Sequence, residues 1–126
     1  MIDPVFWREA AGAANNHPAF AVKAKHLEAL AFTLSIDDTL VPLELHRGAL
    51  SFLSGPHLRG FRFGIRGPFT EWKGVVSGEL PFAKAINVRH GKLRVEGDVV
   101  ALAWATPALW ELFRVTAGRA GVVPHA

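Results

Sequence analysis

The sequence lacks cysteine and contains no apolar run long enough to cross a membrane. Without cysteine the chain can form no disulfide, no thiolate nucleophile and no thiolate metal site. A membrane-spanning helix needs about 20 predominantly apolar residues, and the N-terminal stretch MIDPVFWREA carries charge where a signal peptide would need its apolar segment. We therefore expect a soluble, cytoplasmic protein.

Catalytic and metal-binding motifs are also missing. No GxSxG nucleophile elbow occurs, and no glycine-rich phosphate loop precedes a predicted helix. The six histidines form no HxH or HExxH pair, so we interpret them as surface residues. Asp37 and Asp38 lie in a predicted turn, where such side chains bond to their own backbone. The sequence thus predicts no enzyme, no catalytic residue, no metal site and no cofactor.

The composition is that of one globular domain. Hydrophobic residues make up 50% of the chain and charged residues 20%, which argues against disorder. A length of 126 residues is enough for one core and too short for two ordinary domains, so residues 1–126 are predicted to form one domain. The net charge of +3 permits weak attraction to anionic membranes or nucleic acid and requires neither.

Residues 1–30 have the pattern of two short helices. Asp3 is a good cap for a first helix with Pro4 at its first position. Asn16 or His17 precedes a second helix that has Pro18 near its start. Apolar and charged residues then alternate at helical spacing, which is typical of helices with one buried face.

Residues 31–66 have the period of strands. Apolar side chains alternate with polar ones, and turns are predicted at Asp37-Asp38-Thr39, at Arg47-Gly48 and around Gly55-Pro56. Four successive strands of this kind predict an antiparallel meander with one apolar face. Pro42 indicates that its strand has at least one unpaired side.

Residues 67–116 are predicted to return to helix around one last strand. Helices are expected over residues 67–90, the first containing Trp72 and ending near Gly78. A strand over residues 91–96 follows, and Asp98 is the predicted cap of a C-terminal helix over residues 98–116. Pro107 removes one backbone hydrogen bond and should bend or split this last helix.

The order of these parts resembles the lipid-binding domains of the sterol carrier protein type 2 family. The resemblance covers residues 31–115. It is carried by the helix from Trp72 to Gly78, by the short apolar helix after Pro81, and by the stretch Gly91-x-Leu93-x-Val95-x-Gly97-Asp98. It implies an α+β fold, with a mostly antiparallel five-stranded sheet and helices packed on one face.

The resemblance also implies a function, which is non-catalytic binding or carriage of a hydrophobic ligand. The ligand would be a lipid, a sterol-like molecule or an isoprenoid, held in an apolar tunnel between sheet and helices. The expected partners are this small molecule and a possible partner enzyme or membrane surface. The residues placed on the tunnel wall by position are Phe63, Trp72, Phe82, Ile86, Trp104 and Phe113.

Two other interpretations are weighed against this one. The aromatic side chains of the helices, Trp104 and Trp110 among them, are expected to meet the sheet, and their bulk could fill the tunnel. The result would be a solid-cored interaction protein that docks a partner through its amphipathic helices. Separately, the segment Arg59-Gly60-Phe61-Arg62-Phe63 partly resembles an RNA-binding strand. The fit is poor and the predicted order of elements differs, so nucleic acid is not expected as a partner.

Overall fold

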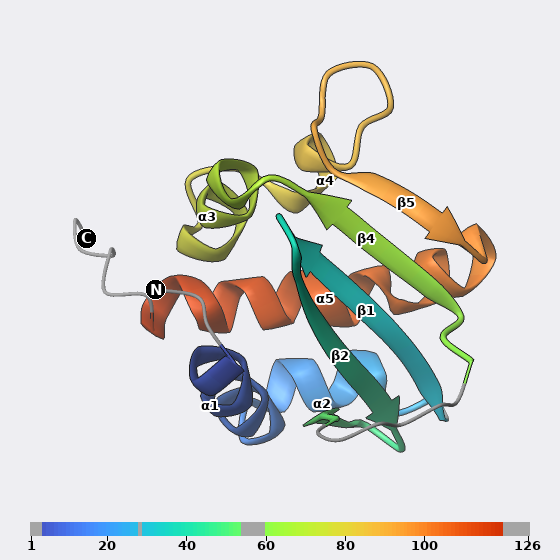
Figure 1. Ribbon diagram of the computed structural model, residues 1–126. Helices are drawn as coiled ribbons and strands as arrows, with labels where there is room; N and C mark the ends of the chain where they lie inside the picture. Colours follow the sequence, from blue (N-terminus) through green and yellow to red (C-terminus); the bar gives the residue numbers. More distant parts are fainter. Residues whose placement is uncertain (1–3, 28, 54–59, 120–126) are drawn as a thin grey trace.

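The computed structural model describes residues 4–27, 29–53 and 60–119 as a curved sheet with helices behind it (Figure 1). The expected Asp3 cap and the Gly55-Pro56 turn lie outside these residues. The helices are α1 (Pro4–Asn15), α2 (Pro18–Ala24), α3 (Phe69–Ser77), α4 (Phe82–Ala85) and α5 (Val99–Arg119). The strands are β1 (Leu30–Ile36), β2 (Thr39–His46), β3 (Ala49–Phe52), β4 (Phe63–Gly67) and β5 (Arg94–Gly97).

The sheet has the strand order β3-β2-β1-β4-β5. All neighbouring strands are antiparallel except β1 and β4, which are parallel. The mostly antiparallel α+β fold is therefore confirmed, but the predicted four-strand meander is wrong. Only β1, β2 and β3 form a meander, and β4 crosses over to pair with the other edge of β1. Alternation shows which residues of a strand are buried and carries no information about which neighbour the strand will choose.

The parallel register brings like side chains together on one face. Phe32 of β1 lies opposite Phe63 of β4, and their rings stack with centroids 5.0 Å apart. On the same face Leu34 and Ile65 are opposite each other and fully buried. The other face is polar, with Arg66 of β4 and Glu96 of β5 in an exposed ion pair at 3.1 Å. One apolar face is thus covered by helices, as expected.

Both predicted hairpin turns are confirmed. Residues 37–38 join β1 to β2, and Arg47 and Gly48 join β2 to β3 with φ angles of 52° and 85°. Positive φ at both central residues is the geometry that matches the twist of a tight hairpin. The prediction that the strand of Pro42 has an unpaired side is wrong, because β2 pairs with both β1 and β3. The ladder of β3 ends opposite Leu43, and at Pro42 the carbonyl accepts from the Leu53 N–H at 2.9 Å. The missing N–H of Pro42 therefore interrupts no ladder.

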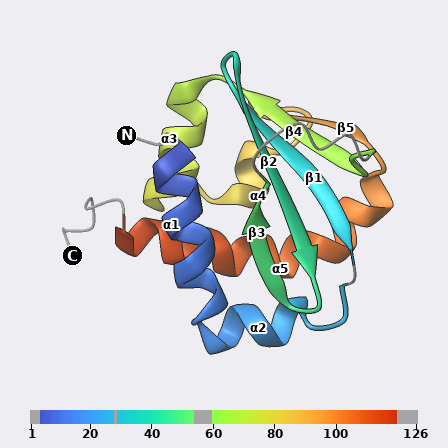
Figure 2. The ribbon, with the colours of Figure 1, turned by 60° about the horizontal axis from the view of Figure 1, so that its bottom comes forward.

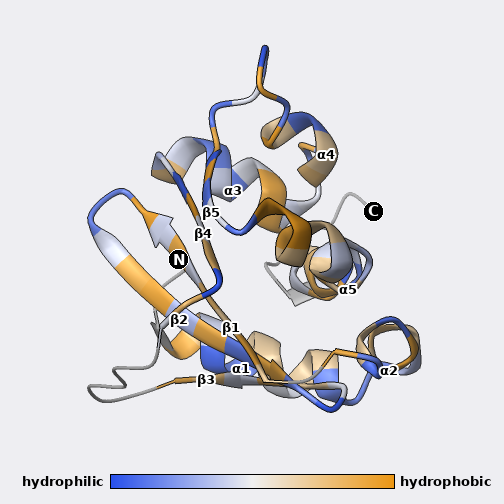
Figure 3. Cartoon of the chain, turned by 90° about the vertical axis from the view of Figure 1, so that its right-hand side faces the viewer, coloured by the Kyte–Doolittle hydropathy of each residue, from blue (hydrophilic) through white to orange (hydrophobic). Residues whose placement is uncertain are grey.

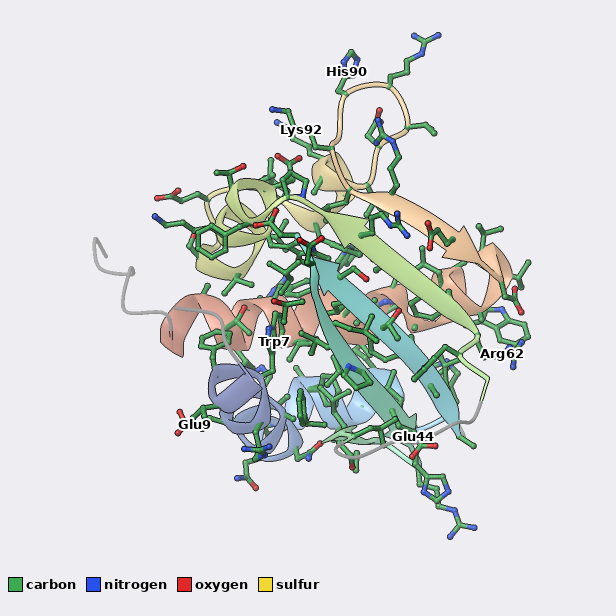
Figure 4. All side chains as sticks on the ribbon, viewed as in Figure 1. Trp7, Glu9, Glu44, Arg62, His90 and Lys92 are labelled. Carbon is green, nitrogen blue, oxygen red and sulfur yellow. The ribbon has the colours of Figure 1, made fainter. Side chains whose placement is uncertain are left out.

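The two N-terminal helices are confirmed, with Pro18 at the start of α2 and His17 as its N-cap residue. Helix α1 packs against β3 and α5 (Figure 2). The Asn15 side chain donates to the Leu50 carbonyl at 2.9 Å and accepts from the Leu50 N–H at 2.7 Å. Trp7 points into the interior while Glu9 points outward (Figure 4), and only 1% of Trp7 is exposed. The N-terminal helices therefore close one end of the core.

In the second half of the chain the helices begin where the sequence indicates, but α5 ends at Arg119 rather than at residue 116. The last strand is shorter and later than the predicted residues 91–96, because it covers Arg94–Gly97. Gly78 ends α3 in the left-handed conformation, with φ at 87°, and Pro81 precedes α4. Asp98 caps α5 by accepting the N–H groups of Val100 and Ala101, both at 3.0 Å. Pro107 does not split α5, which continues to Arg119 as one helix.

Gly91 lies where the chain folds back over α4, and this close approach generates a prediction. A Cβ at Gly91 would overlap the backbone carbonyl of Ala85, whereas a Cβ at Gly12 on α1 would meet nothing within 4 Å. We expect Gly91→Ala to lower the free energy of unfolding by about 2 kcal/mol or more, because backbone must shift. Gly12→Ala, the matched control, should raise it by about 0.5–1 kcal/mol because alanine favours helix. Urea unfolding of both variants tests this, and equal effects would contradict the close contact.

Asp98 generates a second prediction, on pH. The hydrogen bond from Arg62, at 2.7 Å, and then the Ala101 N–H hold the pKa of Asp98 below its ordinary value of 3.8. The charged form therefore contributes stability that is present above the pKa of the unfolded chain and is lost as pH falls through the lower folded-state pKa. We expect Asp98→Ala to melt at a lower temperature than the parent at pH 7, with the difference shrinking on acidification.

The control for this pH experiment is Asp98→Asn. Asparagine keeps an acceptor for the helix N-terminus and loses the ion pair, so its melting temperature should fall between those of the parent and Asp98→Ala. A difference between parent and Asp98→Ala that stays constant down to low pH would show that the charge of Asp98 contributes nothing.

Candidate functional site

An apolar groove of about 280 Å³ lies between α3, α4 and the C-terminal half of α5. Its walls are hydrophobic except at Arg114, which is the one charged side chain among the described residues that line it. The lining residues are Val75, Gly78, Leu80, Pro81, Phe82, Ala83, Trp110, Phe113, Arg114 and Ala117. Such a surface can remove an apolar ligand from water but offers little to orient a polar one.

The turn between α3 and α4 shapes one wall of the groove. Gly78 reverses the chain, and the Leu80 N–H then donates to the Gly74 carbonyl at 2.9 Å. A Cβ at Gly74 would lie 3.1 Å from the Leu80 Cβ, so a glycine lets Leu80 lie close against α3. The Thr116 hydroxyl of α5 donates to the Val76 carbonyl of α3 at 3.0 Å. These contacts join α3 to α5 and to the turn that follows α3, beside the groove.

Three of the predicted wall residues lie together on the inner side of the groove, and two of them, Phe82 and Phe113, line it. The rings of Phe82 and Phe113 are 5.0 Å apart between centroids, and the ring of Trp72 lies 6.3 Å from Phe113 on the inner side. Trp72 is fully buried, and its Nε1 donates to the Ser35 carbonyl of β1 at 2.9 Å. Phe82 and Phe113 therefore face the groove, and Trp72 lies behind them and reaches the sheet.

The other predicted wall residues do not reach this groove. Phe63 is buried in the sheet against Phe32, and Ile86 is half-buried at the end of α4. The expectation that Trp104 and Trp110 pack inward against the sheet is wrong, because they are 61% and 47% exposed. The inner side of α5 consists instead of smaller residues, namely Ala101, Leu102, Ala105, Ala108, Leu109 and Leu112. A helix that is apolar all round has no hydrophobic period from which to read its inner side.

Eight of the ten lining residues were not predicted as wall residues, and Leu80, Trp110, Arg114 and Ala117 are four of them. The last three stand with Phe113 at helical spacing, so they lie along one stripe of α5. That spacing could have identified the stripe from the sequence once Phe113 was chosen. Leu80 could not have been found, because its position depends on the turn after Gly78.

Two further hollows have more polar walls. Trp104 lines one of about 310 Å³ together with His26, Leu27, Leu30, Arg62 and Ala101. The other, of about 640 Å³, is lined by Glu71, Leu80, Ala83, Lys84, Asn87 and His90. His90 lies on the loop between α4 and β5, which points away from the rest of the molecule (Figure 4). The groove at Phe82 and Phe113 is therefore the more hydrophobic site.

The described residues contain no cluster of metal ligands and no membrane-crossing helix. In residues 4–27, 29–53 and 60–119, no three histidine or acidic side chains are grouped so that they could hold a metal ion. Over the same ranges no helix combines the length and the hydropathy needed to span a bilayer. Phe63, which the RNA-binding pattern would expose for base stacking, is only 2% exposed.

The fold matches solved structures of sterol carrier proteins. A crystal structure of sterol carrier protein 2 has a TM-score of 0.73 and 21% identity, over 93% of this chain and 97% of that chain. A conserved hypothetical protein from Thermus thermophilus, described as possibly a sterol carrier protein, has a TM-score of 0.68 and 23% identity, over 94% and 88%. The ubiquinone synthesis protein UbiJ-SCP2 has a TM-score of 0.61 and 14% identity, over 86% and 89%.

At the level of sequence, no protein-family model and no curated protein matches the chain. The structural matches cover nearly the whole chain in each case, and their identities are low. The chain therefore has the sterol carrier protein 2 fold, and the resemblance predicted from the order of its elements is confirmed.

Trp72 generates a prediction about the contact behind the groove. We expect Trp72→Phe to lower the free energy of unfolding by about 2 kcal/mol or more, because the Ser35 carbonyl loses its donor and a small cavity opens. The matched control is Trp104→Phe, whose side chain is mostly exposed and should change stability by less than about 0.5 kcal/mol. Chemical denaturation measures both, and equal effects would mean that Trp72 does not link the sheet to the helices.

Proposed function

We propose that this protein binds and carries a hydrophobic small molecule, without catalysis, in the groove lined by Phe82 and Phe113. The observation that carries the proposal is the apolar wall of this groove, formed where α3, α4 and α5 meet in a sterol-carrier-type fold. The cytoplasmic location expected from the sequence is part of the proposal.

The ligand would be held mainly by the area that it removes from water. Each Å² of apolar surface buried contributes roughly 25 cal/mol. The groove's volume of about 280 Å³ lies just below the range of roughly 300–1,000 Å³ typical of small-molecule sites. It therefore suits a segment of an alkyl or isoprenoid chain, and selectivity would be by shape and length.

A longer or wider guest would have to pass Phe113. The Phe113 ring separates the groove from Trp72 and lies against both Phe82 and Trp72. Rotation of Phe82 and Phe113 would extend the groove inward, in the direction of the tunnel expected between sheet and helices. Trp72 would then line the extended groove, and only a ligand that entered further would contact Phe63 and Ile86.

The names of the structural neighbours agree with this class of ligand. One neighbour is a sterol carrier protein and another is a ubiquinone synthesis protein. The ligand classes that we propose are accordingly lipids, sterol-like molecules and isoprenoids. Arg114, exposed at the edge of the groove, is placed to meet a polar or anionic end group of such a molecule.

The test is binding of a fluorescent fatty acyl probe, with native mass spectrometry of the purified protein to detect a co-purifying lipid. Ala83 is exposed and lines the groove, so Ala83→Trp should fill the groove and weaken probe binding by at least about tenfold, or about 1.4 kcal/mol. Val88→Trp is the matched control, because Val88 is 84% exposed and lies outside the groove, and it should bind like the parent.

Two results would refute the proposal. One is the absence of both co-purifying lipid and probe binding in the parent protein, which would favour a solid-cored interaction protein. The other is equal weakening by Ala83→Trp and Val88→Trp, which would place the probe elsewhere on the molecule.

A further inference from the structure

The outward side of α5 is apolar along most of its length. Val99 and Val100 are 61% and 55% exposed, and Trp104 and Trp110 are 61% and 47% exposed. Ala103 and Gly118 are also exposed, and Pro107 is half-buried. Figure 3 looks along α5 and shows it beside the strands, between α2 and α4, with its other side uncovered by any labelled element. We call this surface, from Val99 to Gly118, the α5 face.

A helix that borders water normally carries charged residues on its outer side. Among the described side chains of α5, Arg114 is the only charged one on the outer side. Glu111 is 8% exposed and is turned inward, with its carboxylate 3.7 Å from His17 Nε2. The α5 face therefore combines large apolar side chains with positive charge and has no acidic group of its own.

The neighbouring helices add positive charge at the margins of this face. Lys23, Lys25 and His26, at the end of α2, are exposed, and so is Lys84 of α4, while neither helix contains an acidic residue. His26 and Arg62 line the hollow beside Trp104. Of the acidic residues near the two ends of the face, Asp98 is paired with Arg62 at 2.7 Å. Glu79, in the turn after α3, is exposed.

From these observations we propose that the α5 face docks the protein on a bilayer surface that contains anionic lipids. Tryptophan side chains favour the headgroup region of a bilayer, where the ring is buried and the N–H stays hydrated. Basic residues beside them are attracted by the negative surface charge of anionic lipids. The valines at the start of α5 would enter the boundary between headgroups and acyl chains.

A second copy of the chain fits this face less well than a bilayer does. In a symmetric dimer the same patch meets itself, so the Arg114 side chains and the lysines at the margins would face like charges. The face offers no acidic residue to compensate them. A bilayer surface with anionic lipids supplies that negative charge over the whole area.

Docking in this orientation would also place the lipid-binding groove at the membrane. Trp110 belongs both to the groove and to the α5 face, so the groove opens on the docking side. A chain-like guest could pass between bilayer and groove without crossing water. This consequence depends on the proposed function, whereas docking itself does not.

The protein carries its own reporter for the experiment. Trp7 and Trp72 are buried, with exposures of 1% and 0%, so a change in tryptophan fluorescence on docking reports on Trp104 and Trp110. The probes are vesicles of phosphatidylcholine alone and vesicles with about 30 mol % phosphatidylglycerol. We expect a blue shift and quenching by brominated acyl chains with the anionic vesicles, and at least about tenfold weaker binding in high salt.

The variant Val100→Gln/Trp104→Gln tests the face outside the groove. Both side chains are more than half exposed and neither lines the groove, so the fold and probe binding should persist while vesicle affinity falls at least about tenfold. Leu40→Gln is the matched control, because Leu40 is 56% exposed on β2 and should leave vesicle affinity unchanged.

Several outcomes would overturn the inference. They are no binding of the parent to anionic vesicles, equal loss in the Leu40 control, or a sedimentation-detected dimer that Val100→Gln/Trp104→Gln dissociates. The last result would assign the face to a second copy. Binding of the fluorescent probe in the absence of vesicle binding would overturn docking alone and leave the proposed ligand site standing.

Discussion

The contact on which the rest of the structure depends is made by Trp72. Its indole N–H donates to the Ser35 carbonyl on β1, and its ring lies against Phe113 on α5. One fully buried side chain from α3 thus joins the sheet to the long C-terminal helix. Because its one polar atom is satisfied, this large residue can occupy the centre without leaving an unpaired donor. The groove exists because Phe113 and Phe82 cover the outer side of that contact.

The close approach of α5 to the rest of the molecule explains where its tryptophans lie. The inner side of the helix presents Ala101, Ala105 and Ala108, whose small side chains allow close packing. Trp104 and Trp110 would not fit there, and they are left largely exposed. These two indole rings, which could have filled the interior, lie instead on the outside, next to the groove and beside basic residues. A hydrophobic surface in contact with water is costly unless something covers it.

The sequence predicted the elements better than it predicted their partners. Proline, glycine and aspartate at the helix ends, such as Pro18, Gly78 and Asp98, act on the backbone within a few residues, so each could be read directly. The parallel pairing of β1 with β4 joins residues about thirty positions apart. Alternation in β4 was consistent with pairing to β3 or to β1, and the pairing with β1 depends on how the whole sheet assembles.

The residues of the candidate site also fall into those that could be predicted from the sequence and those that could not. Phe82, Phe113 and Trp72 were chosen from the sequence by their positions in helices that the resemblance places against the sheet. Leu80 and Trp110 were not, because one depends on a chain reversal and the other on the rotation of α5 about its axis. Local composition determined which segments are helix or strand and where they end, since those choices depend on neighbours in the chain. The tertiary structure alone decided which side of α5 is buried and which of its apolar side chains remain at the surface, because that depends on how closely distant elements can pack.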